Sequence, residues 1–165
     1  MSFKQLSPDL LRKHKGTSFV GVGVVFFCHD GNGKFLMSKR SQNTRDEQGR
    51  WEIAGGGLKW GSTAEENIRR EVKEEFAANS KSIDFIGYRD VFRKLNDGTP
   101  THWLMLDFAV LVDPKEIKRN EPDMSDEIGW FTIDNQPKPV HSQHNKLMRK
   151  YKKEIDLILT QGKNN

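Results

Sequence analysis

The chain has 165 residues, of which 35% are hydrophobic and 30% charged, and this length and composition suit one globular domain spanning residues 1–165. The net charge is +4, but basic and acidic residues are interspersed, so we expect no clear nucleic-acid partner. The single cysteine excludes an internal disulfide, and there is no apolar stretch of membrane-spanning length and no signal-peptide region, so we expect a cytoplasmic protein.

The first third of the chain alternates apolar runs with turn residues. The run VGVGVVFFC at residues 20–28 and a second run at residues 35–38 are separated by HDGNGK, so we predict a β-hairpin. A polar loop at residues 41–50 then leads to a short strand at residues 51–53. Three consecutive glycines follow at residues 55–57.

A helix should begin after the glycines, because Ser62 and Thr63 each offer an N-cap oxygen with a glutamate three residues later. We expect it to end at about residues 78–80. Strands are predicted at residues 83–92, 102–112 and 128–133, followed by a C-terminal helix at about residues 142–159. These elements predict an α/β (α+β) fold with a mixed sheet between helices and a core at about residues 18–135.

Three carboxylates crowd one side of the first predicted helix. At about 100° per residue, Glu71, Glu74 and Glu75 share one arc of about 100° beside an apolar stripe. Like charges four residues apart destabilise a helix by a few tenths of a kcal/mol. Arg70 can pair with Glu74, which leaves Glu71 and Glu75 free for a different counter-charge. A divalent cation would supply that charge.

The chemistry around these carboxylates points to a phosphorylated ligand. Oxygen-only ligands suit Mg²⁺ or Mn²⁺, and Mg²⁺ usually binds few carboxylates together with substrate phosphates. The preceding glycines allow close approach of the backbone, and the helix N-terminus favours phosphate. Arg40 and Arg50 flank the polar loop and are candidates to clamp phosphates bidentately.

Residues 56–78 resemble the Nudix box, G-x5-E-x7-R-E-U-x-E-E-x-G-U, the signature of MutT-like hydrolases. The box positions are filled by Gly56, by Arg70 with Glu71, by Val72, and by Glu74 with Glu75. Similar stretches outside the box extend the resemblance to about residues 20–133. The resemblance implies an α/β/α sandwich around a central mixed sheet and hydrolysis of a nucleoside diphosphate linked to a group X.

The resemblance also implies roles for individual residues. Glu71 and Glu75 are the expected metal ligands. Glu74 would bind the metal directly or through a water molecule, and the Gly55 carbonyl would be a further ligand. Glu127 matches a place where some relatives contribute another acid, and the general base is either Glu71 or a carboxylate outside the box. Arg70 would orient Glu74, and substrate contacts fall to Arg40, Arg50, Gly56 and Gly57.

Four positions depart from the box or its usual surroundings. Ser62 stands at the first glutamate, Ala54 stands where proline is common, and Ala77 and Ala78 replace the closing glycine and aliphatic residue. Without the glycine, we expect Asn79 to adopt the left-handed C-cap conformation. The metal-binding end of the box is intact.

Several functions remain open at this point. The leading one is a Mg²⁺-dependent pyrophosphohydrolase of nucleoside triphosphates or nucleotide sugars, with Mn²⁺ as an alternative ion. A sugar hydrolase similar to GDP-mannose mannosyl hydrolases, with attack at the sugar carbon, is a second, and a non-catalytic nucleotide-binding sensor is a third. The long C-terminal helix is compatible with a homodimer.

Overall fold

The computed structural model describes residues 7–161, so residues 1–6 and 162–165 of the expected 1–165 domain lie outside the described residues. The helices are α1 (Pro8–His14), α2 (Ala64–Phe76), α3 (His144–Lys150) and α4 (Lys152–Gln161). The strands are β1 (Gly21–His29), β2 (Phe35–Arg40), β3 (Trp51–Glu52), β4 (Gly55–Gly57), β5 (Ser80–Lys94), β6 (Pro100–Val112) and β7 (Ser125–Phe131). No helix within residues 7–161 is long and apolar enough to cross a membrane.

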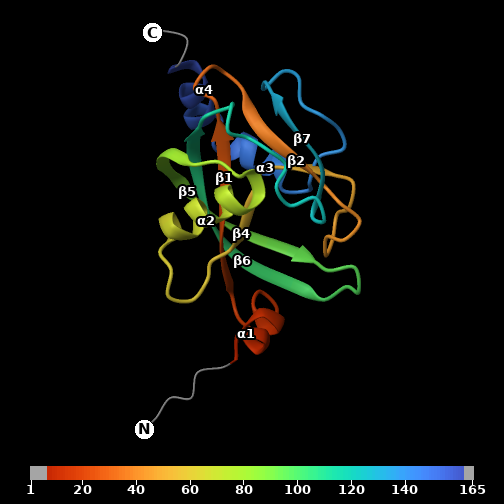
Figure 1. The fold of residues 1–165 in the computed structure, drawn as a ribbon. Coiled ribbons are helices and arrows are strands. Elements are labelled where there is room, and N and C mark those ends of the chain that lie inside the picture. Colours follow the sequence, from red (N-terminus) through yellow and green to blue (C-terminus); the bar gives the residue numbers. More distant parts are fainter. Residues whose placement is uncertain (1–6, 162–165) are drawn as a thin grey trace.

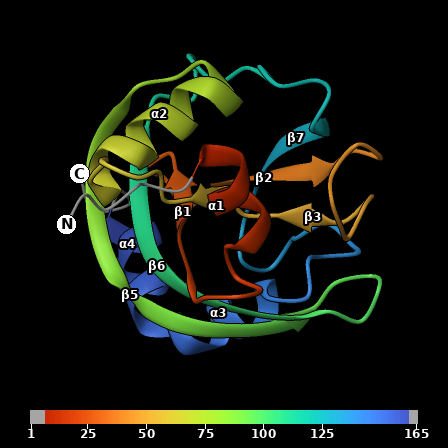
Figure 2. The same ribbon diagram turned by 90° about the horizontal axis from the view of Figure 1, so that it is seen from below.

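The strands form one mixed sheet (Figure 1). Its main path runs β3-β2-β1-β6-β5, with β4 pairing β1 and β7 pairing β2. The β1–β6 pair is parallel and the other pairs are antiparallel. Helix α2 lies on one side of β1, and α3 and α4 lie on the other (Figure 2). The predicted mixed sheet between helices is therefore confirmed.

The alternation of side chains along β1 explains why both faces of the sheet are buried. Val24 and Phe26 pack with Ile68 and Val72 of α2 in one core cluster. Phe27, whose side chain points to the opposite face, packs with Leu147 of α3 and Ile155 of α4 in the other cluster. A strand covered on both faces reads as a continuous apolar run, which is what VGVGVVFFC shows.

Helix α2 begins where the sequence predicts and ends earlier. Thr63 is the N-cap, and the capping box with Glu66 is complete, with Glu66 N donating to Thr63 Oγ1 at 3.2 Å. Ala77 itself takes the left-handed conformation, with φ 55° and ψ 19°. The expectation that Asn79 would provide this cap is wrong, since its backbone N–H instead donates to Glu116.

Several boundaries differ from the sequence prediction. The β1–β2 hairpin pairs only at His29 and Phe35, because β6 occupies one edge of β1 along its whole length and β4 pairs with residues 23–25 on the other edge. The single C-terminal helix predicted for residues 142–159 is wrong: α3 and α4 are separated at Tyr151, with φ −111° and ψ 29°. The helix α1 and the short strand β4 were not predicted.

Candidate active site

A cavity of about 220 Å³ lies where α2 meets the ends of β2 and β3. Four carboxylates line it, namely Glu52, Glu71, Glu75 and Glu121. Helix α2 supplies Glu71 and Glu75 one turn apart, β3 supplies Glu52, and Glu121 comes from the segment before β7. Residues distant in sequence are therefore gathered into one acidic site.

The glycines of β4 bring the backbone close to this site. Gly55 lines the acidic cavity, and β4 pairs with β1 at Val24 and Val25. A Cβ atom at Gly56 would lie 2.6 Å from Glu71 Oε1, so a side chain there would displace the Glu71 carboxylate. The glycine spacing of the sequence thus corresponds to direct packing of the β4 backbone against a carboxylate.

Arg70 contacts two of the carboxylates on α2. Its Nη2 donates to Glu71 Oε1 at 2.6 Å, and its Nη1 pairs with Glu74. The expectation that Arg70 would pair with Glu74 alone and leave Glu71 free is wrong in this respect. Glu75 makes no ion pair with any residue in the range 7–161.

The electrostatics of the cavity disfavour ionised carboxylates. Burial, with the charges of Glu52, Glu71 and Glu121 adding to it, raises the pKa of Glu75 well above its usual value. Burial and the charges of Glu71 and Glu74 also raise the pKa of Glu121. Burial raises the pKa of Glu52 too, although the Arg40 guanidinium opposes that shift. Among the described residues, Arg40, which is paired with Glu52, is the one cationic side chain that lines the cavity, so the four carboxylates outnumber the positive charge there.

The residues fit a divalent cation by their chemistry, because four carboxylates offer the hard oxygen ligands that Mg²⁺ and Mn²⁺ prefer. The side chains do not converge on one point: within residues 7–161, no three acidic, histidine or cysteine side chains form a metal-ligating group. Arg70 accounts for part of this, since it draws Glu71 toward itself. An ion would compete with that guanidinium.

Two expected metal ligands lie outside the cavity. Glu74 is 44% exposed and faces Arg70 and solvent. Glu127 is exposed on β7, where it pairs in register with Lys39 of β2. The cavity carboxylates that sequence reasoning missed are Glu52 and Glu121. Glu52 stands three residues before Gly55 in a strand with polar alternation, which was the only sequence signal for it.

A larger cleft of about 600 Å³ adjoins the acidic cavity. The two share Arg40, Glu52, Gly55 and Met124 as lining residues. The cleft continues over the face of β1, β6 and β5 that α3 and α4 leave open, where apolar side chains form its walls: Val25, Ile53, Val91, Met105 and Leu147. Gly56 and Gly57, the two glycines expected to contact substrate, also line this cleft.

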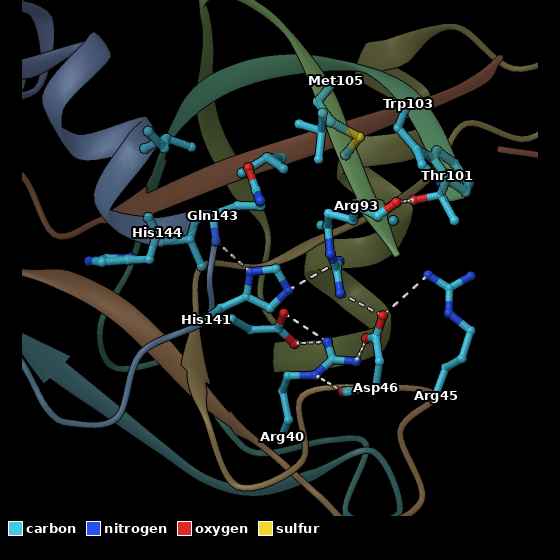
Figure 3. Close-up of a pocket in the computed structure, with 18 of the residues that line it drawn as sticks. Arg40, Arg45, Asp46, Arg93, Thr101, Trp103, Met105, His141, Gln143 and His144 are labelled. Carbon is cyan, nitrogen blue, oxygen red and sulfur yellow. Dashed lines mark hydrogen bonds and ion pairs between the residues drawn. The ribbon is translucent and has the colours of Figure 1, made fainter. Parts of the chain in front are cut away.

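Arg40 is held by the protein at the boundary of the two compartments (Figure 3). Its Nη1 donates to both oxygens of Glu52, at 2.7 and 2.8 Å, and its Nη2 donates to Asp46 at 3.0 Å. With 14% of its side chain exposed, Arg40 positions the loop before β3 instead of standing free for phosphate. Arg50 lies outside the cleft and donates to the Val140 carbonyl at 3.0 Å.

A second arginine joins the same loop to the far wall of the cleft. Arg93 Nη2 donates to Asp46 at 2.6 Å and lies 3.0 Å from Glu47, and its Nη1 lies 3.3 Å from His141 (Figure 3). Glu47, at φ 51°, accepts from the backbone and hydroxyl of Ser142 at 2.7 and 2.6 Å. The polar loop at residues 41–50 is thereby fixed to β5 and to the start of α3.

The arrangement places an acidic, oxygen-rich cavity beside a longer cleft with apolar walls and a polar rim. Such a pair of compartments can hold a molecule with a phosphorylated end and a flat, mostly apolar end. The carboxylates can bind a cation that neutralises phosphate, and the glycines of β4 let the backbone touch that part of the ligand.

Comparison with known proteins agrees with the geometry. Residues 18–151 match the NUDIX domain family. A curated nucleoside triphosphatase, NudI of Enterobacter sp. (strain 638), is 30% identical over 107 residues, which cover 61% of this chain and 74% of that protein. A MutT NUDIX hydrolase from Burkholderia pseudomallei superimposes with a TM-score of 0.69 at 24% identity, over 79% of this chain and 97% of the other. The NUDIX domain of Shewanella oneidensis NrtR, solved in complex with ADP ribose, superimposes with a TM-score of 0.63 at 15% identity, over 91% of this chain and 99% of the other.

Proposed function

Because the chain belongs to the Nudix family and is a hydrolase acting on phosphoanhydride bonds, we propose that it is a Mg²⁺-dependent pyrophosphohydrolase of nucleoside triphosphates. The acidic cavity carries this proposal: four carboxylates gather there, and Glu75 has no cationic partner among residues 7–161. The triphosphate is favoured over other nucleotides by the curated relative, which is a nucleoside triphosphatase.

Glu71, Glu75 and the Gly55 carbonyl would hold the ion, with Glu52 and Glu121 adding negative charge around it. When bound, Mg²⁺ neutralises phosphate charge and lowers the pKa of a coordinated water. Gly55 and Gly56 let the substrate phosphates approach the backbone without a side chain between them. The site would thus supply positioning and charge neutralisation, which dominate phosphoryl transfer.

The remaining side chains have distinct roles in this proposal. Arg70 orients Glu71 through the 2.6 Å contact and restrains Glu74. Glu121 is the candidate general base, because it lines the cavity, belongs to no ion pair among the described residues and lies outside α2. Arg45, which is 61% exposed at the cleft, is a more accessible phosphate contact than Arg40.

The direct test is hydrolysis of a panel of nucleoside triphosphates and nucleotide sugars, with Mg²⁺ and with EDTA, followed by product identification. We expect Mg²⁺-dependent release of pyrophosphate from triphosphates, and a loss of at least about 100-fold in Glu75→Gln. Glu65→Gln on the exposed side of α2 is the matched control and should retain activity. Free hexose as product would indicate attack at sugar carbon, and nucleotide binding without turnover would indicate a sensor.

A further inference from the structure

A buried ion pair forms part of the floor of the cleft, away from the acidic cavity. Arg89 of β5 and Asp107 of β6 are 7% and 1% exposed. Arg89 Nε donates to Asp107 Oδ2 at 2.8 Å, and its Nη2 donates to Oδ1 at 2.7 Å. This bidentate contact fixes the plane of the guanidinium, since both parallel bonds must be kept.

One end of this guanidinium has no protein partner. Among residues 7–161, Arg89 Nη1 makes no hydrogen bond, although Arg89 is more than nine-tenths buried. Nη1 retains some accessible surface, and Arg89 is a lining residue of the cleft, so a ligand in the cleft is the natural acceptor for this end of the guanidinium. A buried donor without an acceptor is costly unless water or a ligand supplies one.

Sheet register places this donor at a useful distance from the acidic cavity. Val25 of β1 pairs with Gly55 of β4 on one edge and with Asp107 of β6 on the other. Two strand spacings therefore separate Gly55 from Asp107, about 10 Å across the sheet. Gly55 borders the proposed phosphate site, so the ion pair lies where the opposite end of a bound nucleotide would reach.

The walls between these points suit a flat aromatic ring. Val25, Val91, Met105 and Leu147 line the same cleft and carry no hydrogen-bonding side-chain group. A nucleobase can place its faces against such side chains and its edge against a polar group. Arg89 offers that edge only donors, because a guanidinium has no acceptor.

We propose that Arg89, held by Asp107, determines base specificity by donating from Nη1 to a carbonyl oxygen of the nucleobase. This inference deepens the proposed nucleotide hydrolysis and rests on it. Uracil, thymine, guanine and cytosine each carry a carbonyl oxygen, whereas adenine has only ring nitrogens as acceptors, and its exocyclic amino group is a donor that would face Nη1 unfavourably. The cleft therefore selects a base that places a carbonyl oxygen against Nη1 over adenine placed with its amino group there, because a site built around a buried donor rejects a ligand that leaves this donor unpaired.

Hydrolysis of UTP, GTP and ATP under identical Mg²⁺ conditions tests this selection. We expect kcat/KM for UTP and GTP to exceed that for ATP by about tenfold or more. In Arg89→Lys, the ammonium still pairs with Asp107, but lysine has no second nitrogen that can donate to the base. The ratio of kcat/KM for UTP or GTP to that for ATP should therefore fall to within about twofold. The double variant Arg89→Met with Asp107→Leu removes the pair without leaving a buried charge and should give the same result.

Lys81→Met with Asp113→Leu is the matched control, because it removes an exposed ion pair outside the cleft and should keep the preference. Thermal unfolding verifies that each variant is folded. A wild-type protein without preference, or a preference that persists in the folded Arg89 variants, overturns the inference and leaves Arg89 a structural residue.

Binding of nucleoside monophosphates separates this inference from the proposed reaction. Calorimetric titration of the wild-type protein with UMP, GMP and AMP needs neither turnover nor a variant. Tighter binding of UMP and GMP by about tenfold supports base selection even if no triphosphate is hydrolysed, an outcome that would contradict only the proposed function. Equal binding, or tighter binding of AMP, contradicts the role of Arg89 even if triphosphates are hydrolysed.

Discussion

Replacing Glu75 by glutamine should stabilise the protein in the absence of metal while removing its response to metal. Glu75 lines the acidic cavity with Glu52, Glu71 and Glu121, and it has no cationic partner among residues 7–161. An amide of nearly the same shape removes one charge from this group. If Glu75 serves to bind a cation, its charge should lower the free energy of unfolding as long as no cation is bound.

The size of the effect follows from the helix geometry. Glu71 and Glu75 are one turn apart, with about 6 Å between Cβ atoms, so two full charges would repel by about 3 kcal/mol at an effective dielectric constant of 20. This is an upper limit, because the raised pKa of Glu75 relieves part of the repulsion by protonation. Exposed pairs of this kind cost only a few tenths of a kcal/mol, and Glu71 is 15% exposed, so we expect a gain of about 1–2 kcal/mol. At about 2–4 °C per kcal/mol, Tm should rise by about 2–8 °C.

Thermal unfolding with EDTA, and with Mg²⁺ or Mn²⁺ at about 100 times its Kd, measures both effects. Wild-type protein should gain about 2.7 kcal/mol from saturation at that concentration, or about 5–10 °C, and Glu75→Gln should gain almost nothing. Glu65→Gln, whose carboxylate pairs with Arg69 at 2.6 Å outside the cavity, should keep the metal response. The reasoning is refuted if Glu75→Gln is less stable than wild type in EDTA, or if it keeps the full metal-induced shift.

Three further changes test the fold around the site. Thr63→Ala should lower the unfolding free energy by about 1 kcal/mol because it removes the α2 N-cap, whereas Thr63→Ser should not; equal chemical-denaturation midpoints for the two would contradict this. Ala77→Gly should raise the free energy of unfolding by about 0.5 kcal/mol, because relief of the left-handed strain at φ 55° outweighs the entropy that glycine adds to the unfolded chain. A denaturation midpoint below that of the wild type would contradict this. Burial lowers the pKa of His144 to about 4 in the folded protein, against about 6.5 in the unfolded chain. Between these pH values the unfolded chain binds a proton that the folded protein does not, so the free energy of unfolding decreases as pH falls from about 6.5 to 4. His144→Gln should flatten the denaturation-derived stability profile in that window by up to about 3 kcal/mol, and a profile parallel to wild type would contradict the assignment.

The parts of the site that could be predicted from the sequence are local ones. Helix α2, its cap at Thr63 and the shared side of Glu71 and Glu75 follow from helical periodicity and spacing alone. Interactions within about one helical turn are encoded by neighbouring residues, so a pattern in the sequence is enough to indicate them.

The parts that could not be predicted depend on long-range packing. Glu52 and Glu121 reach the cavity from separate segments, and apart from the polar alternation around Glu52 nothing near either residue in the sequence distinguishes it from a surface acid. The same holds for Arg40, whose position before a polar loop suggested phosphate binding but whose partners Asp46 and Glu52 fix it within the fold. Arg89 meets Asp107 only through the pairing of β5 with β6.

The break between α3 and α4 has a similar origin. Leu147, Tyr151 and Ile155 follow helical spacing, so the sequence favours one continuous helix. In the structure the Tyr151 hydroxyl donates to the Tyr88 carbonyl at 2.9 Å, and its ring packs directly against Gly87 of β5. These contacts with a distant strand accompany the departure of Tyr151 from helical dihedral angles, and periodicity cannot report them.

The most direct measurement is the anomalous diffraction signal of crystals soaked with Mn²⁺ and a slowly hydrolysed nucleoside triphosphate analogue. We expect one or more manganese peaks in the acidic cavity, bounded by Glu71, Glu75 and the Gly55 carbonyl, with the phosphates of the analogue bound to the same ions. An analogue bound in the cleft with no manganese in that cavity would contradict the proposal that these carboxylates hold the metal for hydrolysis.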